Sequence, residues 1–257
     1  MAPVGFEVER VLEPLHSDRA DRVYLLTRSG TDAAGAFLEE ILRRLKRDAP
    51  SMEVEVVPVD IWSVLGTLQA LRSIFEREGR LDRHAPEVVP VQVNVSTGTK
   101  ITAIAGTLAC MLWKGEPYYA QVSRSWYSGI TPKVRPVNDV VTRIDPVTVY
   151  ELRAPAPDLV EVLAALERRG GELRKRELIR ELGLDRPESP AGEPLTAQAQ
   201  HSRLRRRLEP LEGKWGFVRA ATAGSRGRVR LTGQGRLALA LFGRPPPEEP
   251  PHRPPFH

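Results

Sequence analysis

Seven consecutive residues near the middle of the chain have the composition of an anion-binding turn. They are Asn94-Val95-Ser96-Thr97-Gly98-Thr99-Lys100, and they follow an apolar run and precede a stretch of small and apolar residues. Hydroxyls can donate to phosphate, Gly98 lets a ligand approach the backbone, and a helix that starts here would present free N–H groups. Lys100 would add a positive charge. The alternative is an ordinary strand-to-helix turn, in which Ser96 or Thr97 caps the helix and Lys100 points to water.

Familiar nucleotide-binding and catalytic motifs are absent from the sequence. There is no G-x-x-x-x-G-K-[ST] spacing around Thr99-Lys100 and no G-x-G-x-x-G after the first predicted strand, which argues against ordinary ATP or NAD use. Cys110 is the only cysteine and lies in an apolar helical run, so we expect an inert thiol, no metal site and no cofactor. No carboxylate pair or suitably placed histidine supports acid–base catalysis.

A second group of residues, nearer the C-terminus, has the chemistry of a DNA-binding helix. A helix from about Leu195 or Thr196 would place Ala197, Leu204, Leu208 and Leu211 on one apolar stripe. The opposite face carries groups that suit base edges and phosphates. These side chains are Gln198, Ser202, Arg203, Arg205 and Arg206, and Arg226 and Arg228 follow in a predicted hairpin, where they would contact phosphates. A charged helix face exposed to water is the alternative.

The first half of the chain alternates short β-branched runs with helical patterns, which predicts a Rossmann-like, doubly wound parallel α/β sheet. Predicted strands lie at 1–4, 22–27, 52–57, 88–95 and 118–122, and predicted helices at 7–16, 32–47, 61–78 and 100–113. With the strand order 3-2-1-4-5, a ligand would bind outside the carboxyl ends of the first and fourth strands. The loops that meet there would bring Gly5, Phe6, Thr27, Arg28 and Ser29 to the 94–100 turn.

The second half predicts an α+β winged helix-turn-helix. Pro155-Ala156-Pro157 marks the boundary, because paired prolines favour an extended linker. Predicted helices start at Asp158, span 173–182 and run from about 195 to 211, with hairpin strands at 215–219 and 228–232. We therefore expect a ligand domain at 1–153, a DNA-binding domain at 154–243 and a disordered, Pro-rich tail at 244–257.

The net charge differs between the two halves. Residues 1–153 hold 19 Lys+Arg against 20 Asp+Glu, a net charge of −1, whereas residues 154–257 hold 19 against 13, a net charge of +6. A basic C-terminal half after a nearly neutral N-terminal half indicates a polyanionic partner for the C-terminal half, since neutralisation of phosphates dominates the affinity for nucleic acids. The alternative is a basic surface in contact with water.

The 94–100 turn resembles the signature of CRISPR-associated Rossmann-fold (CARF) domains. Gly5-Phe6-Glu7, Glu9-Arg10-Val11, Pro14-Leu15 and Val23-Tyr24-Leu25-Leu26-Thr27 are similar to the opening of archaeal regulators that join such a domain to a winged helix. The resemblance implies a homodimer that binds a cyclic oligoadenylate, or a related nucleotide, across its two-fold axis. It implies that Thr97, Gly98 and Thr99 contact phosphate or ribose, that Lys100 balances phosphate charge, and that Gly5, Phe6, Arg28 and Ser29 line the groove. Thr97 stands where many relatives carry Gly.

The sequence therefore favours a ligand-controlled, DNA-binding transcription regulator. One alternative is a metal-independent ring nuclease, in which Lys100 and Thr97 help a ribose 2′-hydroxyl attack the adjacent phosphodiester. Another is a DNA-binding protein whose Rossmann-like half only dimerises. The N-terminus has no secretory pattern, and the longest apolar stretch, 101–113, is too short to span a membrane, so we expect a cytoplasmic protein without membrane contact.

Overall fold

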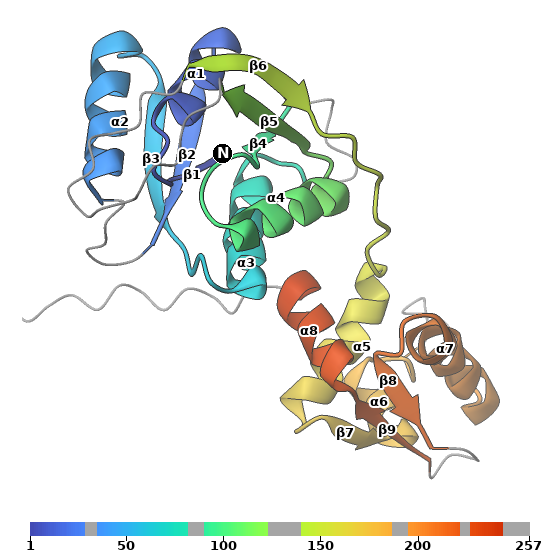
Figure 1. Ribbon diagram of the computed structural model, residues 1–257. Helices are drawn as coiled ribbons and strands as arrows, with labels where there is room; N and C mark the ends of the chain where they lie inside the picture. Colours follow the sequence, from blue (N-terminus) through green and yellow to red (C-terminus); the bar gives the residue numbers. More distant parts are fainter. Residues whose placement is uncertain (29–34, 82–89, 123–139, 187–194, 222–226, 244–257) are drawn as a thin grey trace, which may run out of the picture. The chain divides into compact units, whose positions relative to one another are not determined.

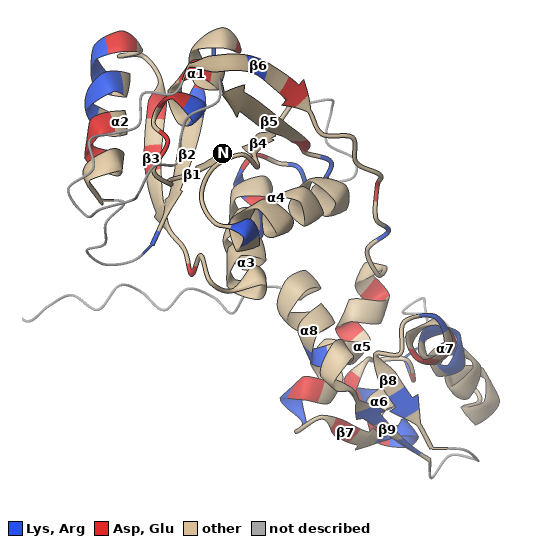
Figure 2. Cartoon of the chain, in the orientation of Figure 1, with Lys and Arg blue, Asp and Glu red and all other residues tan. Residues whose placement is uncertain are grey.

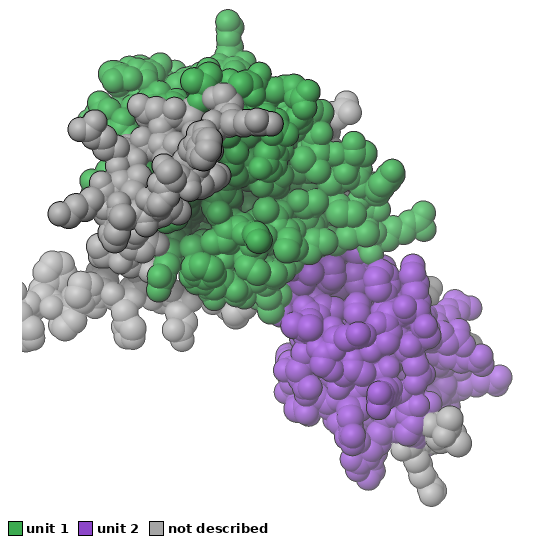
Figure 3. Space-filling view, viewed as in Figure 1, with its two compact units in different colours: residues 1–153 green, residues 154–257 purple. Residues whose placement is uncertain are grey.

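The computed structural model of the chain describes residues 1–28, 35–81, 90–122, 140–186, 195–221 and 227–243. They fall into two compact units, Met1–Arg153 and Ala154–His257 (Figure 3). A hydrophobic cluster in the first unit and another in the second are each built from residues of that unit alone. Each unit therefore has an interior of its own.

The first unit is built on strands that pair in two groups of three. β1 (Ala2–Pro3), β2 (Arg22–Thr27) and β3 (Glu53–Pro58) form one group, and β4 (Gln92–Asn94), β5 (Glu116–Val122) and β6 (Val141–Pro146) form the other. Two hydrogen bonds join the groups: the Met1 amine donates to the Gln92 carbonyl at 2.7 Å, and the Asn94 N–H donates to the Met1 carbonyl at 2.9 Å. The order across both groups is β3-β2-β1-β4-β5-β6, which includes the order expected from the sequence.

Helices cover both faces of this sheet (Figure 1). Val23 and Leu25 of β2 pack in one core with α1 (Glu9–Ser17) and α2 (Gly35–Asp48). Tyr24 points to the other face, where its hydroxyl donates to the carboxylate of Glu78, the residue that ends α3 (Val64–Arg77). Helix α3 packs in turn against α4 (Lys100–Trp113). The unit is a mixed α/β fold with a parallel sheet between two helical layers.

Two features of the first unit differ from the sequence prediction. Strand β6 is antiparallel to β5 and carries no prediction, because Thr142, Arg143 and Asp145 interrupt the apolar pattern that marks a strand. The fourth strand, predicted at 88–95, spans 92–94 in the described residues. Residues 88 and 89 of the predicted strand and the predicted helix start at Asp32 lie outside the described residues. Helix α4 begins and ends at the predicted residues.

The second unit has three helices, a three-stranded sheet and a closing helix among its described residues. In chain order these are α5 (Pro157–Arg168), β7 (Glu172–Arg174), α6 (Lys175–Glu181), α7 (Ala197–Glu209), the π-helical turn η1 (Pro210–Lys214), β8 (Val218–Ala220), β9 (Arg228–Leu231) and α8 (Gly233–Phe242). The strands pair antiparallel in the order β7-β9-β8. Leucines of α5, α6 and α7 share one core with Val218, Val229 and Leu231 of the sheet.

Three local predictions in this unit are wrong. Pro157 starts α5 instead of ending a linker, because a proline fits the first helical position, where no N–H is needed. Leu173 lies in β7 and not in the second helix, since Glu172–Arg174 pairs with β9, more than fifty residues away. Ala197 is exposed because it stands in the first turn of α7, before the helix reaches the core.

Candidate functional site

Loops from three strands meet at the edge of the sheet where β1 and β4 end. Gly5, which follows β1, lies against the turn after β4: a Cβ added to Gly5 would stand 2.9 Å from the backbone nitrogen of Gly98. The Thr99 hydroxyl donates to the Ile61 carbonyl at 3.0 Å, which ties in the loop between β3 and α3. The structure thus brings Gly5 and Gly98 together, at the point where the strand order reverses.

The turn after β4 is held in shape by its own side chains. Asn94 is fully buried, its amide donates to the Arg10 carbonyl at 2.7 Å, and its side-chain oxygen accepts from the N–H and hydroxyl of Ser96 at 2.9 and 2.6 Å. Thr97 is 2% exposed, and its hydroxyl donates to the Pro3 carbonyl at 2.7 Å. Asn94 and Thr97, expected to face a ligand, therefore face the protein, because buried polar groups need partners inside it.

Helix α4 is capped by Thr99, where the sequence suggests Ser96 or Thr97. The Thr99 hydroxyl accepts from the Thr102 N–H at 3.1 Å, and the Thr99 N–H donates to the Thr102 hydroxyl at 2.9 Å. This reciprocal pair is a capping box. Thr99 is thus partly committed to the helix start, and the amides that remain for a ligand belong to neighbouring residues.

An exposed strip remains at the tip of the turn. Gly98 is exposed and has a φ of +79°, and Lys100 is exposed one residue after the cap. The N–H groups of Lys100 and Ile101 lie in the first turn of α4 and have no partner within the helix. Phe6 is 44% exposed beside this strip, in the loop that carries Gly5. Open amides and a lysine at a helix start favour an anion.

The other residues predicted for this site come from the end of β2. Val4 N–H donates to the Leu26 carbonyl at 2.8 Å, so β2 ends beside β1 at the same edge of the sheet. Thr27 is partly buried and Arg28 is exposed. Ser29 lies outside the described residues.

Arg10 is a site residue that the sequence analysis does not find. It is 8% exposed on α1, and its Nη1 donates to the Ser96 carbonyl at 3.1 Å. The Glu7 carboxylate lies 3.7 Å away, and the guanidinium lies 5.6 Å from the centre of the Tyr119 ring. Its Nε is buried without a hydrogen-bond partner among the described residues. The available signal was an arginine between Val8 and Val11 on the apolar face of the helix.

The loop before α3 is the second missed feature. Trp62 is 66% exposed and follows Ile61, whose carbonyl accepts from Thr99. Its backbone N–H donates to Asp60 at 3.1 Å, and Ser63 caps α3 by accepting from the Gly66 N–H at 2.9 Å. The loop that carries this exposed tryptophan is thus tied to the turn that carries Gly98 and Lys100.

In the second unit, helix α7 presents the polar face expected from the sequence. Leu204 and Leu208 are buried, whereas the predicted contact residues Gln198, Ser202, Arg205 and Arg206 are exposed. Arg205 forms an exposed ion pair with Glu209 at 2.5 Å. Arg203 lies on the flank of the helix, and its guanidinium donates to the Arg186 carbonyl at 3.2 Å.

Of the two arginines predicted to contact phosphates from the hairpin, the structure describes one. Arg228 is exposed on β9 and pairs with Glu172 of β7 at 3.1 Å, while Arg226 lies outside the described residues. A pocket of about 490 Å³ lies between α7 and β8, where Lys175, His201 and Ala220 are among its lining residues.

Family models match both units. Residues 1–125 match the family described as HFX_2341_N-like, N-terminal, and residues 158–243 match the DUF6293 C-terminal winged helix domain. The second match covers α5 to α8, whose order and sheet are those of a winged helix. The second unit carries a winged helix domain.

Known proteins resemble this chain weakly. The uncharacterized protein MJ1513 from Methanocaldococcus jannaschii is 27% identical over 133 residues, which is 49% of this chain and 38% of MJ1513, so the chain spans under two fifths of that relative. Can2 from Sulfobacillus thermosulfidooxidans, solved in complex with cyclic tetra-adenylate, is 13% identical with a TM-score of 0.37, over 81% of this chain and 63% of Can2. Protein VC1899 from Vibrio cholerae is 12% identical with a TM-score of 0.36, over 94% of this chain and 63% of VC1899.

The described residues offer little other chemistry. Burial raises the pKa of the Cys110 thiol to about 12, so it carries almost no thiolate at neutral pH. Within the described ranges, no group of three or more His, Cys, Asp or Glu side chains could hold a metal ion. No helix in those ranges has the length and hydropathy of a membrane span.

Proposed function

We propose that this chain is a ligand-controlled DNA-binding regulator. The observation that carries the proposal is the winged helix domain, whose helix α7 exposes Gln198, Ser202 and Arg206 while its leucines are buried. Amide, hydroxyl and guanidinium groups on a recognition helix suit the edges and phosphates of duplex DNA. The net charge of +6 over residues 154–257 supports the same partner.

The controlling ligand is proposed to be an anionic nucleotide, of which a cyclic oligoadenylate is the first to test. Gly98, Lys100 and the open amides of α4 would hold phosphate, and Phe6 and Arg28 would line the groove. Trp62, which the sequence analysis does not select, is available to stack on a base, because aromatic side chains stack on any base. A symmetric ring would bind across a cytoplasmic homodimer with two copies of this strip.

Control follows if the ligand binds two arrangements of the winged helices with different affinity. Only such a difference can shift an equilibrium, and the same coupling makes DNA change the affinity for the ligand. The ring-nuclease alternative loses one of its two predicted side chains, because the Thr97 hydroxyl is buried and donates to the Pro3 carbonyl.

Titration of a duplex from the chain's own upstream region, with and without cyclic tetra- or hexa-adenylate, tests the proposal. The wild-type chain should change its DNA affinity with one of the rings, and Lys100→Ala should lose that change while binding DNA normally without the ligand. Lys114→Ala, which removes an exposed lysine at the other end of α4, is the matched control. Duplex affinity that no ring changes would remove the sensing role.

A further inference from the structure

The outer face of the winged-helix sheet is dense in arginine. Cross-strand partners share a face of a sheet, and alternate residues point to opposite faces. The register places Glu172 opposite Arg230 and Arg230 opposite Arg219, with Arg174 opposite Arg228. The other face of β8 and β9 bears Val218, Val229 and Leu231, which are buried in the core. Figure 2 shows blue on β8 and β9 and red on β7.

Two of the four guanidinium groups of this face share one carboxylate, that of Glu172. Glu172 accepts from Arg228 at 3.1 Å and from Arg230 at 2.8 Å, and these hydrogen bonds hold the pKa of its carboxyl below the usual range. Arg174 and Arg219 are exposed, and neither forms an ion pair within the described part of the chain. The face therefore has an excess of positive charge, and Glu172 pairs with two of its arginines.

We propose that this face, which we call the arginine face (Arg174, Arg219, Arg228, Arg230), binds backbone phosphates of duplex DNA and that Glu172 limits its affinity. The inference rests on the proposed DNA binding but concerns a different surface from that of α7. The leucines of α7 pack with Val229 and Leu231, which lie on the other face of the sheet from the arginines. Guanidinium groups bind phosphate and carboxylate with the same forked geometry, so phosphate must displace Glu172 from Arg228 and Arg230.

A second carboxylate in the same domain offers a matched control. Glu181 of α6 accepts from Arg168 at 3.2 Å and from Arg169 at 2.9 Å, and these arginines are 57% and 60% exposed. Arg228 and Arg230 are 59% and 71% exposed. Glu172→Gln and Glu181→Gln thus each remove one negative charge and release two exposed arginines. The released arginines lie on β9 in the first variant and at the end of α5 in the second.

Fluorescence anisotropy with the full chain tests the inference, using the upstream duplex and a scrambled duplex of equal length over a range of salt. Glu172→Gln should raise the affinity for both duplexes about 3- to 10-fold at low salt, and each added phosphate contact should steepen the plot of log K against log salt by about 0.9. Glu181→Gln should change the affinity less than 2-fold. Arg219→Ala, which breaks no ion pair in the described residues, should reduce the salt slope by about one contact.

The outcomes separate this inference from the proposed function. Equal effects of Glu172→Gln and Glu181→Gln, with unchanged binding by Arg219→Ala, would overturn the arginine face. If Arg206→Ala on α7 still weakened binding in that case, DNA binding itself would stand. If neither the wild-type chain nor Glu172→Gln bound either duplex, both proposals would fall. Thermal unfolding of each variant shows whether a loss comes from misfolding.

Discussion

At the scale of single residues, Gly98 decides the shape of the turn between β4 and α4. Its φ is +79°, and a Cβ would stand 2.7 Å from Pro3 Cβ and 2.7 Å from the Thr102 hydroxyl. We expect Gly98→Ala to lower the free energy of unfolding by about 1–3 kcal/mol, since the left-handed conformation and the overpacking both cost energy. Chemical denaturation measures this.

Gly35→Ala is the matched control in the same unit, because nothing lies within 4 Å of the added Cβ and alanine favours a helix. It should leave stability unchanged or raise it slightly. Equal losses from both substitutions would show that Gly98 has no special conformational role.

Some features of the candidate site are set by neighbouring residues in the sequence, and others are set by contacts with distant residues. The hydroxyls and glycine of the 94–100 turn could be recognised from sequence, because a strand-to-helix turn needs such residues. Their orientation could not, since Thr97 turns inward to the Pro3 carbonyl, more than ninety residues away in the chain. Arg10 was missed for the same reason: its partner at Ser96 is set by the packing of α1 beside β4.

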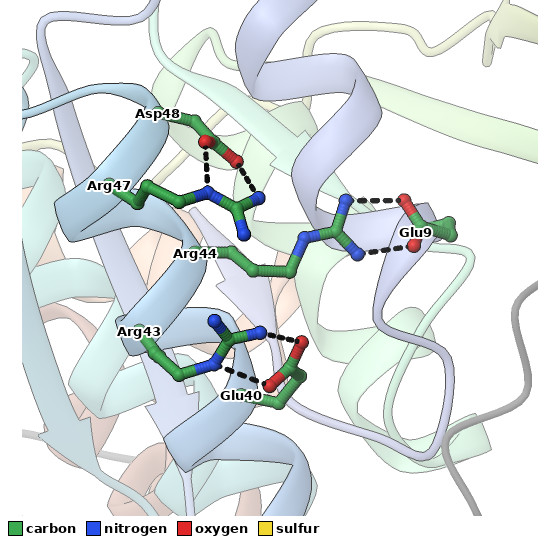
Figure 4. A network of polar contacts seen from close by, with 6 residues as sticks. All are labelled: Glu9, Glu40, Arg43, Arg44, Arg47 and Asp48. Atoms are coloured by element: carbon green, nitrogen blue, oxygen red, sulfur yellow. Dashed lines mark hydrogen bonds and ion pairs between the residues drawn. The ribbon is translucent and has the colours of Figure 1, made fainter.

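At the scale of elements, an ion pair joins α1 to α2. Arg44 binds both carboxylate oxygens of Glu9, with side chains 22% and 20% exposed, whereas Arg43 binds Glu40 within α2 and is 59% exposed (Figure 4). A half-buried pair between helices is less screened by water than a surface pair within one helix. Double-mutant cycles should give a coupling energy of about 1 kcal/mol for Glu9–Arg44 and a smaller coupling energy for the exposed pair Glu40–Arg43.

Salt provides an independent readout of the same difference. Raising the salt concentration should reduce the Glu40–Arg43 coupling more, because exposed charges are screened first. A Glu9–Arg44 coupling no larger than that of Glu40–Arg43 would mean that α1 and α2 are held together by apolar packing alone.

Helices and strands with a strong apolar periodicity can be predicted from the sequence. Strands that depend on pairing with a distant strand cannot. The sequence predicts both ends of helix α4, because an apolar run follows a hydroxyl-rich start. The structure ends the helix at Trp113, and Lys114 after it adopts a left-handed conformation. Strands β6 and β7 were missed because few apolar residues mark them, and each exists through pairing with β5 or β9. The sequence does not decide the role of Pro157, because proline suits both a linker and a helix start.

At the scale of the whole molecule, the two units have separate interiors, and this bears on how a signal could pass between them. The core of the first unit holds Leu12 of α1, and the core of the second holds Leu204 of α7. If no core residue is shared, a ligand can act on DNA binding by changing how the units are arranged without changing how stable each one is.

Hydrogen exchange followed by mass spectrometry on the full chain tests this separation. Leu12→Ala and Leu204→Ala remove side chains that are 0% and 1% exposed, so each should cost about 2–5 kcal/mol within its own unit. Leu12→Ala should speed exchange in peptides from 1–153 and leave those from 154–243 unchanged, and Leu204→Ala should do the reverse. Faster exchange in both units after either substitution would mean that the units unfold together, and ligand binding would then act on DNA affinity through shared stability.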